Sequence, residues 1–113
     1  MKLGTIALAR VQQADGRLKT RPVLLLSLMP PFSDYLVCAL SSKLHHECPD
    51  FDEVIAVDDD DFGSSGLKVA SLVRLGMVAT IPGSVLLGEL GVLSETRLQR
   101  LCSRLARHLG EQQ

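Results

Sequence analysis

The feature that most constrains the fold is an Arg21–Pro22 pair followed at once by the almost wholly apolar run 23–28. Proline has no amide proton to donate to a β-ladder, so within a sheet it fits best at the first residue of a strand. The residue before a proline is pushed toward extended backbone geometry. We therefore predict a strand over 22–29 that is buried on both faces, with the cation of Arg21 just before its first residue.

Other short apolar segments, separated by turn residues, predict a small antiparallel sheet. Strands are expected over 4–11, 35–40 and 53–57, and 69–81 is either two short strands or one strand bent at Gly76. A polar, basic loop is expected over 12–20, and the short turn 30–34 makes its two flanking strands antiparallel. Residues 84–93 fit either a helical turn or a strand.

The C-terminal part of the chain has the pattern of an amphipathic helix. Ser94 is a good N-cap, and Gly110 is expected to end the helix. One face is apolar and the remaining faces are mainly basic, as shown by Leu98, Leu101, Cys102, Leu105 and Leu109 against Arg97, Arg100, Arg104 and Arg107. We predict one domain, 1–113, that is mainly β, with a single helix capping a strongly curved sheet or barrel.

Composition narrows the class of protein. The 113 residues suffice for one domain, and 46% of them are hydrophobic. No segment resembles a signal peptide or reaches the roughly 20 apolar residues of a membrane span, so a cytoplasmic protein without membrane contact is expected. Cys38, Cys48 and Cys102 are odd in number and widely spaced, which indicates reduced thiols and neither a disulfide framework nor a zinc site.

The net charge of −1 conceals a strong asymmetry along the chain. Residues 1–46 hold six basic and two acidic residues, 47–66 hold eight acidic and no basic residues, and 67–113 are again basic. A polyanion could still bind a face that the acidic segment does not reach. The segment 58–66 is predicted to be mobile, and its aspartates 58–61 form a solvated loop, because the glycine and bidentate glutamate of a calcium loop are missing.

Arg21 and Ser41 are the first candidate site residues. If the strands 22–29 and 35–40 form a hairpin, the start of one lies beside the end of the other, so both residues share one edge of the sheet. A guanidinium fork matches a phosphate, and a neighbouring hydroxyl can orient it or share in proton transfer. Arg17 and Lys19 in the preceding loop favour phosphate binding. The simpler alternative is a solvated basic loop and ordinary strand-terminal residues.

His45, His46 and Arg74 are the remaining candidates. Two adjacent histidines suggest a general base or a metal site, but on a strand they would point to opposite faces, and Glu47 and Cys48 add no zinc spacing. The alternative is a surface loop. Arg74 interrupts an apolar strand, so it needs a partner, an interface or a water-facing position.

The order of these features resembles the MazF/PemK toxin family of type II toxin–antitoxin systems over residues 4–110. Each matching motif is short, and their order carries the resemblance. The motifs are 4–6, Gly16 with 19–24, 39–42, 66–71, 73–75, 79–81, 90–94, and the helix that closes with Leu109 and Gly110.

This resemblance implies an SH3-like β-barrel with a C-terminal helix, a homodimer, and a metal-independent endoribonuclease that needs no cofactor. Such an enzyme cuts single-stranded RNA to a 2′,3′-cyclic phosphate and a 5′-hydroxyl, inhibits growth, and is neutralised by a cognate antitoxin. The toxin–antitoxin complex is a possible ligand of operator DNA. The chemistry is general acid–base catalysis with electrostatic stabilisation.

Position by position, the resemblance makes Arg21 the phosphate-binding arginine, Ser41 the catalytic hydroxyl and Arg74 a catalytic arginine. RNA contacts are expected from neighbouring residues, namely Arg17, Lys19, Thr20, Ser42, Lys43, His45 and His46. The chain departs from the PemK pattern at Gly76, Met77 and Ala79. The base could therefore come from His45 or His46, or be lacking. The alternative function is a catalytically degenerate toxin-fold protein that binds nucleic acid or regulates transcription.

Overall fold

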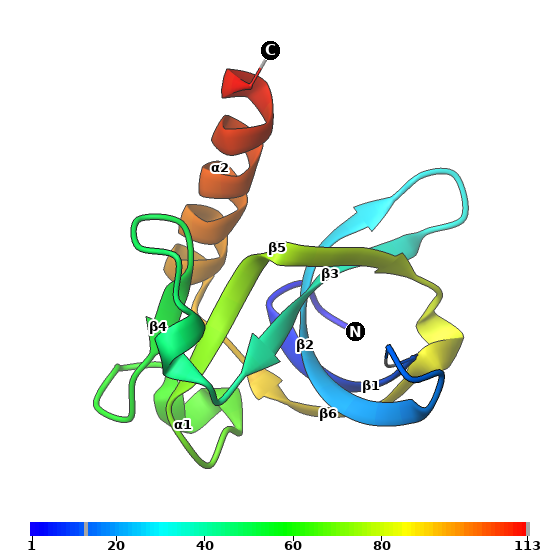
Figure 1. Cartoon of the computed structure of the whole chain (residues 1–113), viewed down its shortest axis with the longest axis horizontal. Helices are drawn as coiled ribbons and strands as arrows, with labels where there is room; N and C mark the ends of the chain where they lie inside the picture. Colours follow the sequence, from blue (N-terminus) through cyan, green and yellow to red (C-terminus); the bar gives the residue numbers. More distant parts are fainter. Residues whose placement is uncertain (13, 113) are drawn as a thin grey trace.

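The chain forms a six-stranded antiparallel sheet with a long C-terminal helix (Figure 1). A computed structural model describes residues 1–12 and 14–112; residues 13 and 113, which fall in the predicted loop and at the end of the predicted domain, lie outside the described residues. The strand order is β4-β5-β3-β2-β1-β6. The elements are β1 (Thr5–Gln12), β2 (Leu18–Met29), β3 (Asp34–Ser41), the 3-10 turn η1 (Leu44–His46), β4 (Glu53–Ile55), α1 (Phe62–Ser65), β5 (Ser71–Ile81), η2 (Gly83–Val85), β6 (Leu86–Val92) and α2 (Glu95–Glu111).

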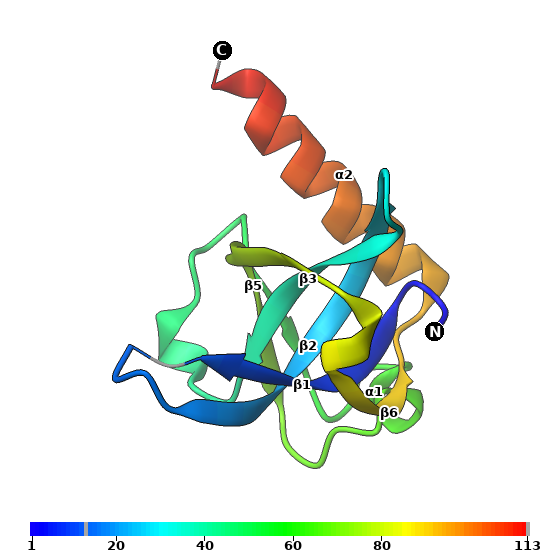
Figure 2. The same ribbon diagram turned by 90° about the vertical axis from the view of Figure 1, so that its right-hand side faces the viewer.

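The sheet curls strongly but stays open, with β4 and β6 as its two edges (Figures 1 and 2). The predictions of a mainly β chain, a curled antiparallel sheet and a C-terminal helix are confirmed. The expectation of one helix was incomplete, because the four-residue α1 lies before β5. Among the described residues, no helix has the length and apolar character that a membrane span requires.

Strand β2 is buried on both faces, as its continuous apolar run predicts. Leu24 and Leu26 belong to the core cluster that contains Leu101 of α2. Val23 and Leu25 alternate with them and belong to a second cluster on the other face. Burial on both faces is why this segment needs no polar residue between 23 and 26.

The start of β2 was predicted wrongly, since the strand begins at Leu18 and not at Pro22. The ladder to β1 continues from Leu24 back to Leu18 and passes through Pro22, which lies opposite Leu8. The ladder to β3, in contrast, ends at Val23. Pro22 therefore lies one residue beyond the pairing with β3, where a missing amide proton costs no ladder bond on that side.

Strand β5 is one strand with a sharp bend along its length, which decides between the two alternatives for 69–81 (Figure 1). On β3, Cys38 pairs with Val78 while its neighbour Ala39 pairs with Arg74. Residues 75–77 are thus extra in the register and form a bulge, and Gly76 lies at its centre. Segment 84–93, for which the sequence fitted either a helical turn or a strand, contains η2 and strand β6, and β6 pairs with β1.

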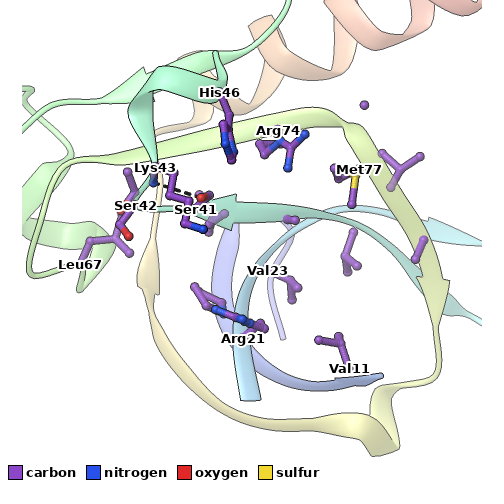
Figure 3. Close-up of a pocket in the computed structure, with 18 of the residues that line it drawn as sticks. Val11, Arg21, Val23, Ser41, Ser42, Lys43, His46, Leu67, Arg74 and Met77 are labelled. Atoms are coloured by element: carbon purple, nitrogen blue, oxygen red, sulfur yellow. Dashed lines mark hydrogen bonds between the residues drawn. The ribbon is translucent and has the colours of Figure 1, made fainter. Parts of the chain in front are cut away.

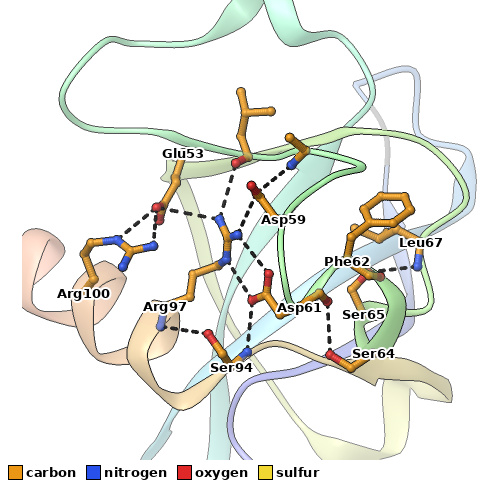
Figure 4. A network of polar contacts seen from close by, with 12 residues as sticks. Glu53, Asp59, Asp61, Phe62, Ser64, Ser65, Leu67, Ser94, Arg97 and Arg100 are labelled. Carbon is orange, nitrogen blue, oxygen red and sulfur yellow. Dashed lines mark hydrogen bonds and ion pairs between the residues drawn. The ribbon is translucent and has the colours of Figure 1, made fainter.

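The acidic segment is anchored through Asp59 and Asp61, so the prediction of a mobile, solvated loop was wrong for these two residues, whereas Asp58 and Asp60 are exposed (Figure 4). The carboxylate of Asp61 accepts hydrogen bonds from Nε and Nη2 of Arg97, both at 2.9 Å, and from the amide of Ser94 at 3.1 Å. Asp59 accepts from Nη2 of Arg97 at 2.8 Å. Arg97, predicted on the outer faces of the helix, is instead buried, because it joins this segment to the start of α2.

Helix α2 has most of the features that its sequence pattern predicts. The Ser94 side chain accepts a hydrogen bond from the amide of Arg97 at 3.2 Å, as an N-cap should. Leu101 is buried, and Leu98, Cys102 and Leu105 pack partly buried against the same core. Leu109 was expected on this face but is 57% exposed, and the helix continues through Gly110 to Glu111. The reason is visible in Figure 1, where the last turns of α2 project beyond the sheet.

The cysteines form no disulfide among the described residues, in line with the prediction of reduced thiols. Cys38 is fully buried, and this burial, followed by the charges of Cys102 and Asp52, raises the pKa of its thiol to about 12. A thiol held protonated in this way packs as an apolar core residue.

Removing the guanidinium of Arg97 should strongly destabilise the fold. The Arg97 and Asp61 side chains are only 8% and 7% exposed, so Arg97→Ala leaves a buried carboxylate without its cation. Breaking such a pair from one side costs about 3–5 kcal/mol. Urea unfolding should show this loss for Arg97→Ala, while Arg107→Ala on an exposed face of α2 should change the unfolding free energy by less than about 0.5 kcal/mol. Equal stability of both variants would contradict the role given to Arg97.

The same network should make stability fall in acid. Burial raises the pKa of Asp61, but hydrogen bonds from Arg97 and Ser94 outweigh it, and the pKa is lowered overall. A backbone hydrogen bond from Ala56 and the contact with Arg97 lower the pKa of Asp59. The resulting stabilisation is complete above the unfolded aspartate pKa of about 3.9 and is lost as the pH falls through the lowered folded pKa.

Unfolding free energies measured from pH 7 to pH 2.5 should therefore fall below about pH 4 for the wild type. Asp61→Asn should be less stable at pH 7 and should show a shallower acid loss. The exposed Asp60→Asn should keep the wild-type profile. An unchanged acid slope in Asp61→Asn would contradict this assignment.

Candidate functional site

A cavity of about 780 Å³ lies inside the curl of the sheet (Figure 3). Its walls come from β1, β2, β3, β5 and the segments around η1 and before β5. Val23 and Val37 line it, whereas their neighbours Leu24 and Cys38 point into the core that contains Leu101 of α2. The cavity is therefore on the face of the sheet that α2 leaves uncovered.

The cavity has an apolar floor and a polar, basic rim. The floor includes the side chains of Val11, Val23, Val37, Val78 and Ile81. The rim includes Arg21, Ser41, Ser42, Lys43, His46 and Arg74. Among the described residues that line the cavity, three are cationic and none is a carboxylate. The electrostatic field in this cavity therefore favours an anion, although the chain as a whole has a net charge of −1.

The structure brings Arg21 and Ser41 to the same cavity, as the hairpin argument predicts. The β2–β3 ladder ends with Val23 opposite Ala39, so continuing its register by two residues brings Arg21 level with Ser41. Both side chains point into the cavity in Figure 3. The β2–β3 hairpin therefore brings two residues that are 20 positions apart in the sequence to the wall of one cavity.

Ser41 is held in a defined hydrogen-bonded turn. Its Oγ accepts a hydrogen bond from the amide of Lys43 at 3.1 Å. A hydroxyl that accepts one bond still has its own proton to donate. Ser41 can thus offer a donor to an oxygen of a bound anion, while the Lys43 ammonium lies on the same rim.

Arg74 lies at the end of the first half of β5, two residues before the bend at Gly76. It pairs with Ala39 of β3, and its side chain is half-buried against the rim. Figure 3 shows it beside His46, which comes from η1. The sequence predicted that Arg74 has a partner, lies in an interface or faces water. In the structure, Arg74 lines the cavity wall.

The two histidines occupy different positions, although they are neighbours in sequence. Both lie on the 3-10 turn η1 and not on a strand, and their rings meet edge to face with centroids 4.3 Å apart. Only His46 lines the cavity. In the part of the chain that the structure describes, no group of three His, Cys, Asp or Glu side chains is placed to hold a metal ion.

The pKa of the His46 imidazole is lowered from its ordinary value of 6.5. The largest cause is desolvation, followed by the charges of His45, Arg74 and Lys43, all of which disfavour an added positive charge. The lowered pKa favours the neutral form of His46, in which an imidazole can accept a proton.

Four of the predicted RNA-binding residues do not line the cavity: Arg17, Lys19, Thr20 and His45. The side chain of Arg17 is 83% exposed and lies 3.8 Å from Asp15. Lys19 and Thr20 are exposed on the part of β2 that extends beyond Arg21 and pairs only with β1. They could contact a long ligand outside the cavity, but they do not form its wall.

Asp52 is the positioning residue that the sequence did not reveal. Its Oδ2 accepts from the amide of Cys48 at 2.9 Å, and its Oδ1 accepts from the amide of Leu75 at 3.0 Å. This carboxylate ties the segment after η1 to β5 beside the Gly76 bend, and so sets His46 against Arg74. Nothing in the sequence distinguishes Asp52 from the other acidic residues around it.

Two comparisons with known proteins point to the same family. The profile of one family, described as "PemK-like, MazF-like toxin of type II toxin-antitoxin system", matches residues 2–109. A solved structure, "Mycobacterium tuberculosis toxin MazF-mt6", superposes with a TM-score of 0.68 at 20% identity, covering 94% of this chain and 96% of that one. At this identity the second likeness shows the fold. A search of curated protein sequences gave no match.

Removing the Asp52 carboxylate should loosen the cavity wall. Asp52 is 8% exposed, and Asp52→Ala would leave the Cys48 and Leu75 amides without their acceptor. An unsatisfied buried donor costs about 1–3 kcal/mol. Urea unfolding should show a loss of this size, and amide hydrogen exchange should rise at Cys48 and Leu75. The exposed Asp60→Ala should change neither, and unchanged exchange in Asp52→Ala would refute the tie.

Proposed function

Because the chain belongs to the PemK-like, MazF-like family of toxins of type II toxin–antitoxin systems, we propose that it is an endoribonuclease that inhibits growth. It cuts single-stranded RNA by transesterification and leaves a 2′,3′-cyclic phosphate and a 5′-hydroxyl. The observation that carries this proposal is the cavity rim, where Arg21, Lys43 and Arg74 line the same cavity as Ser41 with no carboxylate among the described lining residues.

In the proposed reaction the two arginines hold the scissile phosphate. The planar guanidinium forks of Arg21 and Arg74 match phosphate oxygens, and fixed cations are most effective where the phosphorane gathers negative charge. Ser41 donates its hydroxyl proton to an oxygen of the same phosphate. The apolar floor receives the neighbouring ribose and base, and the exposed Lys19 and Arg17 contact the RNA backbone outside the cavity. The reaction is general acid–base chemistry and is metal-independent and cofactor-free in this proposal.

Further proposals follow from family membership. The curled sheet supports an SH3-like barrel as the fold class. A cytoplasmic location is proposed because the protein would meet RNA there. A homodimer would use the β6 side, where Leu87 and Leu90 are 51% and 39% exposed. A cognate antitoxin would cover the basic rim and block RNA, and the complex of the two could bind operator DNA.

A second function is favoured by one observation on β5. Three positions after Arg74 are polar in the family pattern, but this chain has Gly76, Met77 and Ala79 there. Met77 is 51% exposed and lines the cavity. A chain that has lost these groups could bind nucleic acid, or regulate transcription, without cutting. Binding of single-stranded RNA with no cleavage by the wild type would favour this second function.

The Arg21 guanidinium should be essential for cleavage. Purified wild type should cut a mixed-sequence single-stranded RNA and leave 2′,3′-cyclic ends, while Arg21→Ala should lose about 10²–10³-fold in kcat, the usual effect of removing one transition-state donor. Arg21→Lys should recover only part of this loss, because a lysine keeps the charge but not the fork.

Two controls make this test decisive. Arg107→Ala removes an exposed cation on α2 and should cleave RNA like the wild type. Circular dichroism and thermal unfolding should show that Arg21→Ala is folded, since the residue is exposed. Wild-type activity in a folded Arg21→Ala would overturn the role of the rim, and a wild type that cuts no RNA would overturn the proposed function.

A further inference from the structure

His46 occupies a position on the cavity that the roles assigned so far leave unused. Of the three histidines in the chain, it is the one that lines the cavity within the described residues. Figure 3 shows its ring extending from η1 over the rim, beside Arg74 and on the same side as Ser41 and Lys43. An imidazole at this place borders the cavity in which the proposed reaction holds the phosphate.

We propose that His46 is the general base of the RNA cleavage reaction, an inference that rests on the function proposed above. Its neutral imidazole takes the proton of the ribose 2′-hydroxyl, and O2′ forms a bond to phosphorus. The bond from phosphorus to the 5′-oxygen breaks, and the leaving oxygen takes a proton from water at the open mouth of the cavity. The imidazolium then returns its proton to solvent, which restores the enzyme.

The surroundings of His46 keep it in the form that this role requires. The titratable and charged groups that border it, from its own turn and from the segments packed against it, are Lys43, His45, Cys48, Asp52 and Arg74. Desolvation and the positive charges among these groups lower the pKa of the imidazole. Two carboxylates are also near: Glu47 follows His46 at the end of η1 and is exposed, and Asp52 uses both oxygens to accept backbone amide hydrogen bonds. A base that is neutral at pH 7 is ready to accept a proton.

The geometry selects His46 over the other candidate bases. The described lining residues include no carboxylate, and Ser41 carries a hydroxyl, which is a weak base without a partner to activate it. His45 does not line the cavity, but its ring packs edge to face on the ring of His46. His45 is therefore a positioning residue in this scheme.

Hydrogen bonds of the backbone hold the turn η1 that carries His46. The amide of His46 donates to the carbonyl of Lys43 at 3.1 Å, and the amide of Glu47 donates to the carbonyl of Leu44 at 3.1 Å. The Asp52 carboxylate then anchors the end of this segment to β5 through Cys48 and Leu75. A base carried on a fixed turn needs little backbone reorganisation before proton transfer.

The test compares the wild type with His46→Ala and His46→Gln on a mixed-sequence single-stranded oligoribonucleotide. Losing a general base lowers kcat by about 10²–10⁴-fold. The wild-type rate should fall in acid as His46 becomes protonated, and the variants should lack this acid limb. Added imidazole should restore part of the activity of His46→Ala. Binding of the 2′-O-methyl oligonucleotide, which has no proton to remove, should stay within about threefold of the wild type because a base contributes little to ground-state binding.

His108 provides a matched control, because it lies on α2 and does not line the cavity. His108→Gln should keep the wild-type rate and acid limb. A separate readout, independent of turnover, is the NMR titration of His46, which should show a pKa below 6.5.

Several outcomes would overturn the proposal. Cleavage by His46→Ala within about threefold of the wild type, or an acid limb that survives in this variant, would remove His46 as the base and leave the proposed function standing. Equal losses of 2′-O-methyl binding and of cleavage would reduce His46 to a binding residue. A titration above 6.5 would contradict the neutral imidazole. A wild type that cuts no RNA would overturn the proposed function and this inference together.

Discussion

The burial of β2 on both faces is the constraint from which the architecture of the site follows. One face is covered by the core that α2 completes, and the other is covered only because the sheet curls over it. A curled sheet of this size is not filled at its open end, so a cavity remains where the apolar run begins. Arg21 stands at that point, and its position as the last polar residue before the buried run is what places a cation on the rim.

A second constraint fixes part of the negative charge of the chain at the start of α2, through Glu53, Asp59 and Asp61. The segment 47–66 contains eight acidic residues, which would weaken anion binding if they lay over the rim. Arg97 binds Asp59 and Asp61, and Arg100 binds Glu53 at 2.6 Å (Figure 4). The close packing of α1 on β6 supports this arrangement, since a Cβ on Gly91 would collide with the Ser64 and Ser65 carbonyls. The structure thus separates charges that the sequence places only a few residues apart.

Local chemistry explains which parts of this arrangement are visible in the sequence. The apolar run of β2, the turn after it and the Ser94 cap act over a few residues, so they predict the hairpin, the placement of Arg21 near Ser41 and the start of α2. The Arg97–Asp61 pair spans 36 residues and the Asp52–Leu75 bond spans 23, and no local pattern reports such contacts. For the same reason the sequence could not separate His45 from His46, because only the turn at η1 and the bend of β5 decide which ring faces the cavity.

The departures from the family pattern on β5 and the position of His46 concern the same cavity wall. Gly76 and Met77 leave the bent part of β5 without a group that could accept a proton, and the bulge there turns Arg74 toward η1. A carboxylate at this place would be an effective base, but its charge would oppose the field of Arg21, Lys43 and Arg74 that favours a phosphate. A neutral imidazole accepts a proton without cancelling that field before the reaction. The positive charge that it gains then faces the phosphorane at the moment when the negative charge there is greatest. The absence of an acidic residue at 75–81 of β5 and the presence of a histidine on η1 are therefore compatible features of one basic cavity.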